Sequence, residues 1–220
     1  MLTVLKGPHA GEKAFFAEGE LLWQHPENGF FTEQGEAVEK IRTSGRQELA
    51  GETVFCDCLG DKKKLVICGA GHVGVALLRM ALMLGFDTTV LEDRPSFADA
   101  ARRAGAKRVI CDSFEQGLDA VDSDEDTYFV VMSRGHRYDL VCLEKIVKKT
   151  YAYLGMMGSK GRSALVRKNL LEQGVPAEQV EGLHAPIGLT IHAETPEEIA
   201  VSILGEIISI KNQEKKTCGF

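Results

Sequence analysis

The sequence predicts an α/β protein: a Rossmann-like, doubly wound parallel sheet with helices on both faces, preceded by a small, mostly β N-terminal region. Two observations lead to this fold class. From Leu65 onward, short apolar runs alternate with segments of helical periodicity, as in consecutive strand–helix–strand units. The runs are apolar almost throughout, as expected of strands buried on both faces. The 220 residues, 44% of them hydrophobic, are enough for one such domain and a smaller one.

Residues 1–60 are expected to form the small β region. The stretch "KAFFAEGELLWQ" predicts two short strands around Glu18-Gly19, "TVFCDCL" predicts another strand, and "VEKIR" predicts one or two helical turns. Gly60-Asp61 and the lysines that follow mark a boundary. We therefore expect three parts: the β region at 1–60, the α/β domain at 61–212 and a polar tail at 213–220.

The larger domain is expected to alternate strands with helices. The predicted strands are 65–68, 88–92, 108–111, 127–133 and 151–155. The predicted helices are 73–84, 97–105, 139–149, 163–174 and one that starts at Pro196. Gly85 is expected to end the first helix, and one face of that helix carries the apolar residues Val73, Ala76, Leu77, Met80, Ala81 and Leu84.

The final helix has the clearest start signal. Thr195 can cap it, Pro196 suits its first position, and Glu198 completes a capping box. The polar residues after Lys211 are expected to fray. The apolar stripe that should pack on the sheet consists of Ile199, Ile203, Ile207 and Ile210.

A glycine-rich loop joins the first strand to the first helix. Its residues, Gly69-Ala70-Gly71-His72-Val73-Gly74, form a G-x-G-x-x-G fingerprint of dinucleotide binding. The first glycine allows the tight turn, the second lets a pyrophosphate approach the backbone, and the third lets the helix pack closely. The start of a helix also favours an anion. We expect a nucleotide-like ligand here, the alternative being a Rossmann-like domain that has lost its ligand.

An acidic residue after the second strand is expected to bind ribose hydroxyls. Asp93 lies 24 residues after Gly69, close to the usual spacing, and Glu92 is the other candidate. Arg94 suits either a 2′-phosphate or a surface position. His72 is unusual in such a loop, and it can act as a neutral donor to a ligand oxygen or simply line the turn.

Three stretches resemble the XdhC/CoxI family: "LVICGAGHVGVALLRMALMLGFDTTVLEDRPSFA", "YLGMMGSKGR" and "APIGLTIHAETPEEIAVSILGEII". The resemblance covers about Val54 to Ile210. It implies an accessory factor for molybdenum hydroxylases such as xanthine dehydrogenase, which binds molybdenum cofactor, supports its sulfuration and delivers it to the apoenzyme. The implied partners are the apo molybdenum hydroxylase and a cysteine desulfurase, and the implied assembly is a homodimer.

The sequence departs from the family pattern in several places. Residues 1–60 do not match the N-terminal Gly-Gly-Gly and Glu motif of many members. Ser133-Arg134-Gly135-His136 stands where the family commonly has Thr-His-Asp-His, so only the second His is retained. Thr190-Ile191-His192 replaces the usual Asp-Ile-Gly. These differences concern cofactor handling more than the fold.

Candidate ligand contacts cluster at the predicted carboxyl ends of the strands, where open α/β sheets bind ligands. Besides the glycine loop, they are Asp93, Arg94, Ser133, His136, Gly158 and Ser159. The stretch around Gly158 can face an anion or form a strand-to-helix turn whose helix Ser159 caps. The ligand implied by the family is molybdenum cofactor, as molybdopterin or its dinucleotide form, because either carries a phosphate or pyrophosphate. NAD(P) is the alternative.

Two alternative functions fit the predicted fold: an NAD(P)-dependent oxidoreductase and a nucleotide-sensing regulatory module. His136 with Asp139 comes nearest to a catalytic pair, and we expect a carrier without turnover of its own. His184, His192 and Glu194 were considered as metal ligands, but lone histidines are more often structural. We expect no bound metal.

The charge and apolar patterning of the sequence indicate where the protein is located and which classes of partner it lacks. The net charge of −6 argues against nucleic acid. No stretch has the apolar length of a membrane span or a signal peptide, so we expect a cytoplasmic protein without membrane contact. Cys56 and Cys58 would share one face of a strand, but the six cysteines are expected to be thiols without a function.

Overall fold

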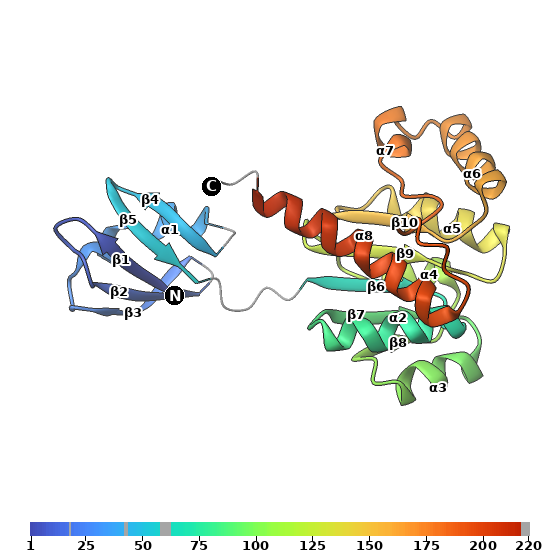
Figure 1. The fold of residues 1–220 in the computed structure, drawn as a ribbon, viewed down its shortest axis with the longest axis horizontal. Helices are drawn as coiled ribbons and strands as arrows, with labels where there is room; N and C mark the ends of the chain where they lie inside the picture. Colours follow the sequence, from blue (N-terminus) through green and yellow to red (C-terminus); the bar gives the residue numbers. More distant parts are fainter. Residues whose placement is uncertain (18, 42–43, 58–62, 217–220) are drawn as a thin grey trace. The chain divides into compact units, whose positions relative to one another are not determined.

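The computed structural model describes residues 1–17, 19–41, 44–57 and 63–216. The chain divides into two compact units, one of Met1–Asp61 with Glu214–Phe220 and one of Lys62–Gln213 (Figure 1). Each unit has its own sheet. No helix in the described residues is both long and apolar enough to cross a membrane.

The first unit contains an antiparallel sheet in the order β3-β2-β1-β5-β4. Its strands are β1 (Leu2–Lys6), β2 (Lys13–Ala17), β3 (Glu20–His25), β4 (Gly45–Leu49) and β5 (Glu52–Cys56). The predicted strand pair around Glu18-Gly19 corresponds to β2 and β3, with Glu18 itself outside the described residues. Cys58, predicted to share a face with Cys56, also lies outside them.

The first unit also has a core of its own. A short 3-10 helix, η1 (Phe30–Glu33), and helix α1 (Gly35–Glu39) follow β3. Helix α1 begins three residues before the predicted "VEKIR", because Gln34 O accepts the Val38 N–H and closes the first turn there. The buried apolar residues of this unit are Leu2, Val4, Ala14, Phe31, Val38, Leu49, Val54 and Cys56.

The second unit contains the predicted parallel sheet, in the order β10-β9-β6-β7-β8. Its strands are β6 (Lys64–Cys68), β7 (Asp87–Leu91), β8 (Arg108–Ile110), β9 (Thr127–Val131) and β10 (Tyr153–Met156). Its helices are α2 (His72–Met83), α3 (Pro95–Arg103), α4 (Phe114–Asp119), α5 (His136–Ile146), α6 (Lys160–Glu172), α7 (Ala177–Glu181) and α8 (Pro196–Lys216).

Helices cover both faces of this sheet, as predicted. Successive residues of β6 alternate between two cores: Leu65 packs with α2, α3 and α8, whereas Val66 packs with α4, α5 and α6. Figure 1 shows α8 lying across the first of these faces. Strand order reverses beside β6, with β7 and β8 on one side and β9 and β10 on the other. The loops after β6, β7 and β9 therefore meet at one edge, at the usual place for a ligand crevice.

Several helix boundaries differ from the prediction. Helix α5 starts at His136 rather than Asp139, and its N-cap is Gly135, which has no side chain to signal the start. Helix α8 continues to Lys216 instead of fraying after Lys211, because the Lys, Gln and Glu residues there are good helix formers. The short helix α4, capped by Ser113, was not predicted, since Gly117 interrupts its sequence pattern.

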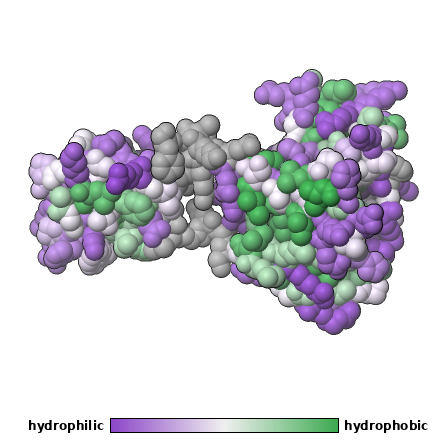
Figure 2. Space-filling view, viewed as in Figure 1, coloured by the Kyte–Doolittle hydropathy of each residue, from purple (hydrophilic) through white to green (hydrophobic). Residues whose placement is uncertain are grey.

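The outer face of α8 is partly apolar. Figure 2 shows hydrophobic residues gathered on the side of the second unit that carries this helix. Val201 of α8 and Leu189, whose N–H donates to Ser202 O at 3.2 Å, are each about half exposed. Exposed apolar patches are commoner at protein–protein contact surfaces than on the rest of a protein's surface.

Candidate functional site at the carboxyl edge of the parallel sheet

The three glycines of the loop after β6 occupy very different surroundings. Gly69 has a φ of +119°, and a Cβ there would lie 2.5 Å from Met132 O. A Cβ on Gly74 would collide with Gly69 O. A Cβ on Gly71 would meet no atom within 4 Å. Gly69 and Gly74 are therefore required by the protein's own packing, whereas Gly71 leaves open space above the loop.

Helix α2 starts at this open side of the loop. Its N-cap is Gly71, so no side chain caps its first N–H groups, and His72 is an exposed first residue. Val73 follows in the first turn and is half-buried. Uncapped N–H groups at a helix start attract anions. This arrangement suits a phosphate, and the binding of an anion at this loop stays a prediction.

Glu92, rather than Asp93, contacts the glycine loop. Its carboxylate is 1% exposed and accepts the Ala70 N–H at 2.8 Å. It also accepts Arg94 Nε at 2.8 Å and Arg94 Nη2 at 3.1 Å. Burial by itself would raise the pKa of Glu92, but the bonds from Arg94 and Ala70 outweigh it and hold that pKa below its usual value. Glu92 thus fixes the loop and Arg94 together.

Asp93 points to a different partner, Arg134. Arg134 Nη2 donates to Asp93 Oδ2 at 2.8 Å and to the Tyr138 hydroxyl at 2.7 Å, and its guanidinium lies 4.7 Å from the Tyr138 ring centroid. Burial raises the pKa of Asp93, and the neighbouring Glu92 raises it further, while Arg134 acts against both. The sequence did not single out Arg134 as a site residue, because its partner is 41 positions away.

Ser133 and Asp139 are engaged inside the protein. Asp139 is fully buried and accepts hydrogen bonds from the Ser133 hydroxyl and from Arg162 of α6. Asp139 is therefore committed to joining α5 to α6, and it does not serve the His136–Asp139 catalytic pair that was considered. His136 is the first residue of α5, at the same edge of the sheet.

The segment after β10 is a strand-to-helix turn. Ser159 is the N-cap of α6, and its hydroxyl accepts the Arg162 N–H at 3.2 Å. A Cβ on Gly158 would lie 3.1 Å from Arg162 Cδ. The capping role foreseen for Ser159 is confirmed. Contact of Gly158 and Ser159 with an anion stays a prediction.

His184 and His192, two of the candidate metal ligands, have different surroundings. His184 stacks on Tyr153 with ring centroids 4.7 Å apart, and its Nδ1 is 3.4 Å from Glu206 Oε1. His192 has a φ of +56° and is exposed. Within residues 1–216, apart from the few positions not described, no three His, Cys, Asp or Glu residues are grouped to hold a metal ion.

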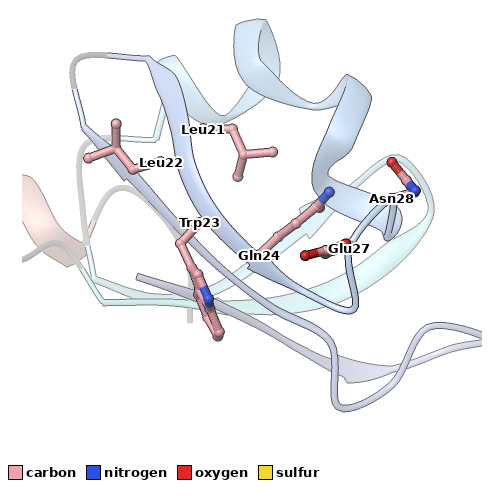
Figure 3. A pocket seen from close by; sticks show the side chains of 6 residues that line it. All are labelled: Leu21, Leu22, Trp23, Gln24, Glu27 and Asn28. Atoms are coloured by element: carbon pink, nitrogen blue, oxygen red, sulfur yellow. The ribbon is translucent and has the colours of Figure 1, made fainter.

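A shallow cavity of about 410 Å³ lies on the first unit. Strand β3 and the turn after it line this cavity (Figure 3). Trp23 and Leu22 are each more than half exposed there. No motif predicted this hollow, and it lies on the antiparallel sheet rather than at the glycine loop. The lining residues are Leu21, Leu22, Trp23, Gln24, Glu27 and Asn28.

Residues 65–207 match the family model described as the XdhC Rossmann domain. The chain belongs to the XdhC family. The matched region contains the whole parallel sheet and the glycine loop, so the resemblance seen in the sequence is confirmed. The XdhC domain here keeps the fold on which its candidate site is built.

Three similar proteins place this XdhC chain among its relatives. The uncharacterized protein YqeB of Escherichia coli (strain K12) is 35% identical over 73% of this chain and 29% of its own length. The molybdenum cofactor insertion chaperone PaoD of the same strain is 28% identical over 70% of this chain and 42% of its own. A crystal structure of a xanthine dehydrogenase from Bacillus halodurans has a TM-score of 0.74 at 25% identity, covering 99% of this chain and 64% of that one. The chain thus spans less than two thirds of each of these proteins.

Proposed function

We propose that this protein is a maturation factor for a molybdenum hydroxylase of the xanthine dehydrogenase type. In this role it binds molybdenum cofactor, holds it during sulfuration and delivers it to the apoenzyme. Its partners are that apoenzyme and a cysteine desulfurase that supplies the sulfur, all in the cytoplasm. Membership of the XdhC family and the similarity to a protein named as a molybdenum cofactor insertion chaperone support this role.

The observation that carries the proposal is the open space at Gly71. At Gly69 and Gly74 the protein's own backbone occupies the space that a Cβ would need, but a Cβ on Gly71 would meet nothing within 4 Å. A glycine that the fold itself does not need, at the uncapped start of a helix, suits close approach of an anionic ligand. The phosphate end of molybdenum cofactor is such a group.

The residues present fit this cofactor. Molybdopterin ends in a phosphate, and its dinucleotide forms contain a pyrophosphate. The backbone of Gly71, His72 and Val73 would hold that group, and Arg134, which follows β9 and is 42% exposed, would be available to it. When bound, the cofactor carries the molybdenum centre that the target enzyme uses. The role of the chain is to bind the phosphate end and protect the cofactor until transfer.

The carboxylates beside the loop are partly engaged within the protein. A dinucleotide-binding acid needs an oxygen free to accept ribose hydroxyls. Glu92 is occupied by Ala70 and Arg94, and Asp93 Oδ2 by Arg134, whereas Asp93 Oδ1 has no hydrogen-bond partner. A ligand that binds mainly through its phosphate does not need Glu92 or Asp93 to give up these partners and accept a ribose hydroxyl instead. Family membership, rather than the carboxylates, therefore favours the maturation role over the dehydrogenase and nucleotide-sensor alternatives.

Transfer to an apo-hydroxylase tests this function. Purified protein loaded with molybdenum cofactor should activate the apoenzyme faster than the same amount of free cofactor, and added cysteine desulfurase should increase the activity further. In a separate reaction with NAD(H) and candidate aldehydes or alcohols, we expect no multiple turnover. Activation no faster than by free cofactor, or sustained hydride transfer, would refute the proposed role.

A further inference from the structure

The Asp93–Arg134 ion pair spans the glycine loop. On one side, Asp93 follows Glu92, whose carboxylate binds the Ala70 N–H. On the other side, Arg134 follows the Met132–Ser133 backbone, which packs against Gly69 so closely that a Cβ there would be 2.5 Å from Met132 O. The loops after β7 and β9 thus flank the glycine loop, and the 2.8 Å bond between Arg134 Nη2 and Asp93 Oδ2 joins them.

The two arginines of this edge are held very differently. Arg94 makes two bonds to Glu92, which is 1% exposed, and its guanidinium lies 3.6 Å from the centre of the Phe97 ring. Arg134 bonds Asp93 through one nitrogen, and its side chain is 42% exposed. Arg134 is the exposed member of this pair, since the Asp93 side chain is 18% exposed. An ion pair held by one nitrogen of an exposed arginine contributes little stability, and the arginine exchanges partners easily. Arg134 is therefore the cation at this site that a ligand can recruit.

We propose that Arg134 selects phosphate-bearing ligands: it leaves Asp93 when a ligand binds and donates instead to the phosphate at the Gly71 side of the loop. This deepens, and rests on, the proposed function. The Tyr138 hydroxyl and ring keep the guanidinium near the loop during the exchange. A phosphate takes up the charge-assisted bonds that the carboxylate gives up. A ligand without an anionic group offers nothing to replace Asp93 and leaves the pair closed.

This proposal makes Asp93 a competitor of the ligand rather than a contact to it. Removing the carboxylate frees Arg134, so anion binding should become tighter. If Asp93 instead contacted the ligand directly, its removal would weaken binding. The sign of the Asp93 effect therefore distinguishes the two roles.

The test uses inorganic pyrophosphate as the probe, titrated into the full chain by isothermal calorimetry. We expect Asp93→Asn to bind about threefold more tightly than wild type, since the competing pair is a weak surface one. Arg134→Gln should bind about tenfold more weakly, through loss of a charged donor. The double variant should bind pyrophosphate with the same affinity as Arg134→Gln, because Asp93 affects binding only by pairing with Arg134.

A matched control pair is available on α3. Arg102 Nη1 donates to Asp99 Oδ1 at 2.6 Å, and both side chains are about half exposed. Asp99→Asn and Arg102→Gln make the same changes of charge away from the loop, and we expect neither to change pyrophosphate affinity. If Asp99→Asn and Arg102→Gln changed pyrophosphate affinity as much as the Asp93 and Arg134 variants do, net charge would explain the results and the assignment of Arg134 would be overturned.

The remaining outcomes are decisive too. Weaker binding by Asp93→Asn, unchanged binding by Arg134→Gln, or no pyrophosphate binding by wild type would each overturn the role of Arg134. Failure of the proposed function looks different: the pyrophosphate pattern would hold, but the chain would not retain molybdenum cofactor on gel filtration. Retained cofactor with an indifferent Arg134 would leave the function standing and reject only the selectivity.

Discussion

At the scale of single residues, neighbouring positions of one motif have opposite physical roles. Gly69 and Gly74 have no room for a side chain, whereas Gly71 has open space. The fingerprint predicted all three glycines from their spacing. It also predicted the tight turn at Gly69 and the close helix packing at Gly74, but not the atoms that exclude a Cβ there, which are Met132 O at Gly69 and Gly69 O at Gly74.

Alanine substitutions at the three glycines should separate these roles. Gly69→Ala and Gly74→Ala should each lower the free energy of unfolding by about 2 kcal/mol, since the added methyl meets backbone atoms and, at Gly69, the φ of +119° is strained for alanine. Gly71→Ala should change it by less than about 0.5 kcal/mol. Urea denaturation of the full chain measures all three, and equal losses would contradict the assignment.

The acid after β7 shows a limit of spacing arguments. The count from Gly69 pointed to Asp93, with Glu92 as the alternative, as the acid for ribose hydroxyls, which stays a prediction, and the structure shows that Glu92 is the one that contacts the loop. Adjacent residues at a strand end point to opposite sides, so a count that is uncertain by one position cannot decide between them. The partner of Asp93, 41 positions away, had no local signal at all.

At the scale of elements, the start of α8 was predicted correctly from its capping box. The capping box at the start of α8 is present: Thr195 Oγ1 accepts the Glu198 N–H at 3.2 Å, and Glu198 Oε2 accepts the Thr195 N–H at 3.0 Å. Helix α5, which starts after a glycine, was placed three residues late. Helix α6 was also placed three residues late, although Ser159 caps it, because a single serine without a full capping box is a weak start signal.

Loss of the α8 cap should destabilise the second unit. Thr195→Ala should lower the free energy of unfolding by about 1 kcal/mol, because it leaves the Glu198 N–H without its acceptor. Thr195→Ser keeps the hydroxyl and should cost much less. Thermal unfolding followed by circular dichroism compares the two variants, and equal losses would show that the methyl group rather than the hydroxyl matters.

Helix α8 is also tied to β10 through Glu206, which sequence patterns did not reveal. Glu206 accepts the Tyr153 hydroxyl at 2.5 Å and the Gly188 N–H at 3.0 Å, beside His184. Burial by itself would raise the pKa of Glu206, but the bonds from His184, Tyr153 and Gly188 outweigh it and lower that pKa. The carboxylate form is therefore favoured in the folded state.

This lowered pKa predicts acid sensitivity. A carboxyl whose pKa is lower when folded contributes stability above its unfolded value, near 4.5, and loses that stability as the pH falls below it. Glu206→Gln should reduce the free energy of unfolding at pH 7 and flatten its decline below about pH 4.5. Denaturant titrations at pH 7 and pH 3.5 check this, and an unchanged slope with pH would contradict it.

At the scale of the whole molecule, the chain consists of two units with separate sheets. The continuous apolar strands of the second unit made its parallel sheet predictable. The first unit was predicted only as mostly β, because its antiparallel strands are short and its pairing brings β1 between β2 and β5. That order is set by contacts distant in the sequence.

We propose that the protein is a homodimer, as the family resemblance implies. Pairing is not needed to complete the first unit, since that unit buries Leu2, Val4, Phe31 and Val54 among others. Light scattering over a hundredfold range of concentration should give twice the chain mass of 24.0 kDa. A mass of one chain throughout would reject the dimer.

The central claim is that the glycine loop binds the phosphate end of molybdenum cofactor, and Gly71→Val tests it most directly. The extended backbone of Gly71 and the free space around it accommodate valine, so the melting curve should be unchanged, as in Met83→Val at the exposed far end of α2. The measurement is cofactor co-eluting with the full chain on gel filtration. Wild type and Met83→Val should retain it, and Gly71→Val should retain about tenfold less, because its side chain occupies the path of the phosphate. Equal retention by Gly71→Val and wild type, with equal melting curves, would contradict the claim.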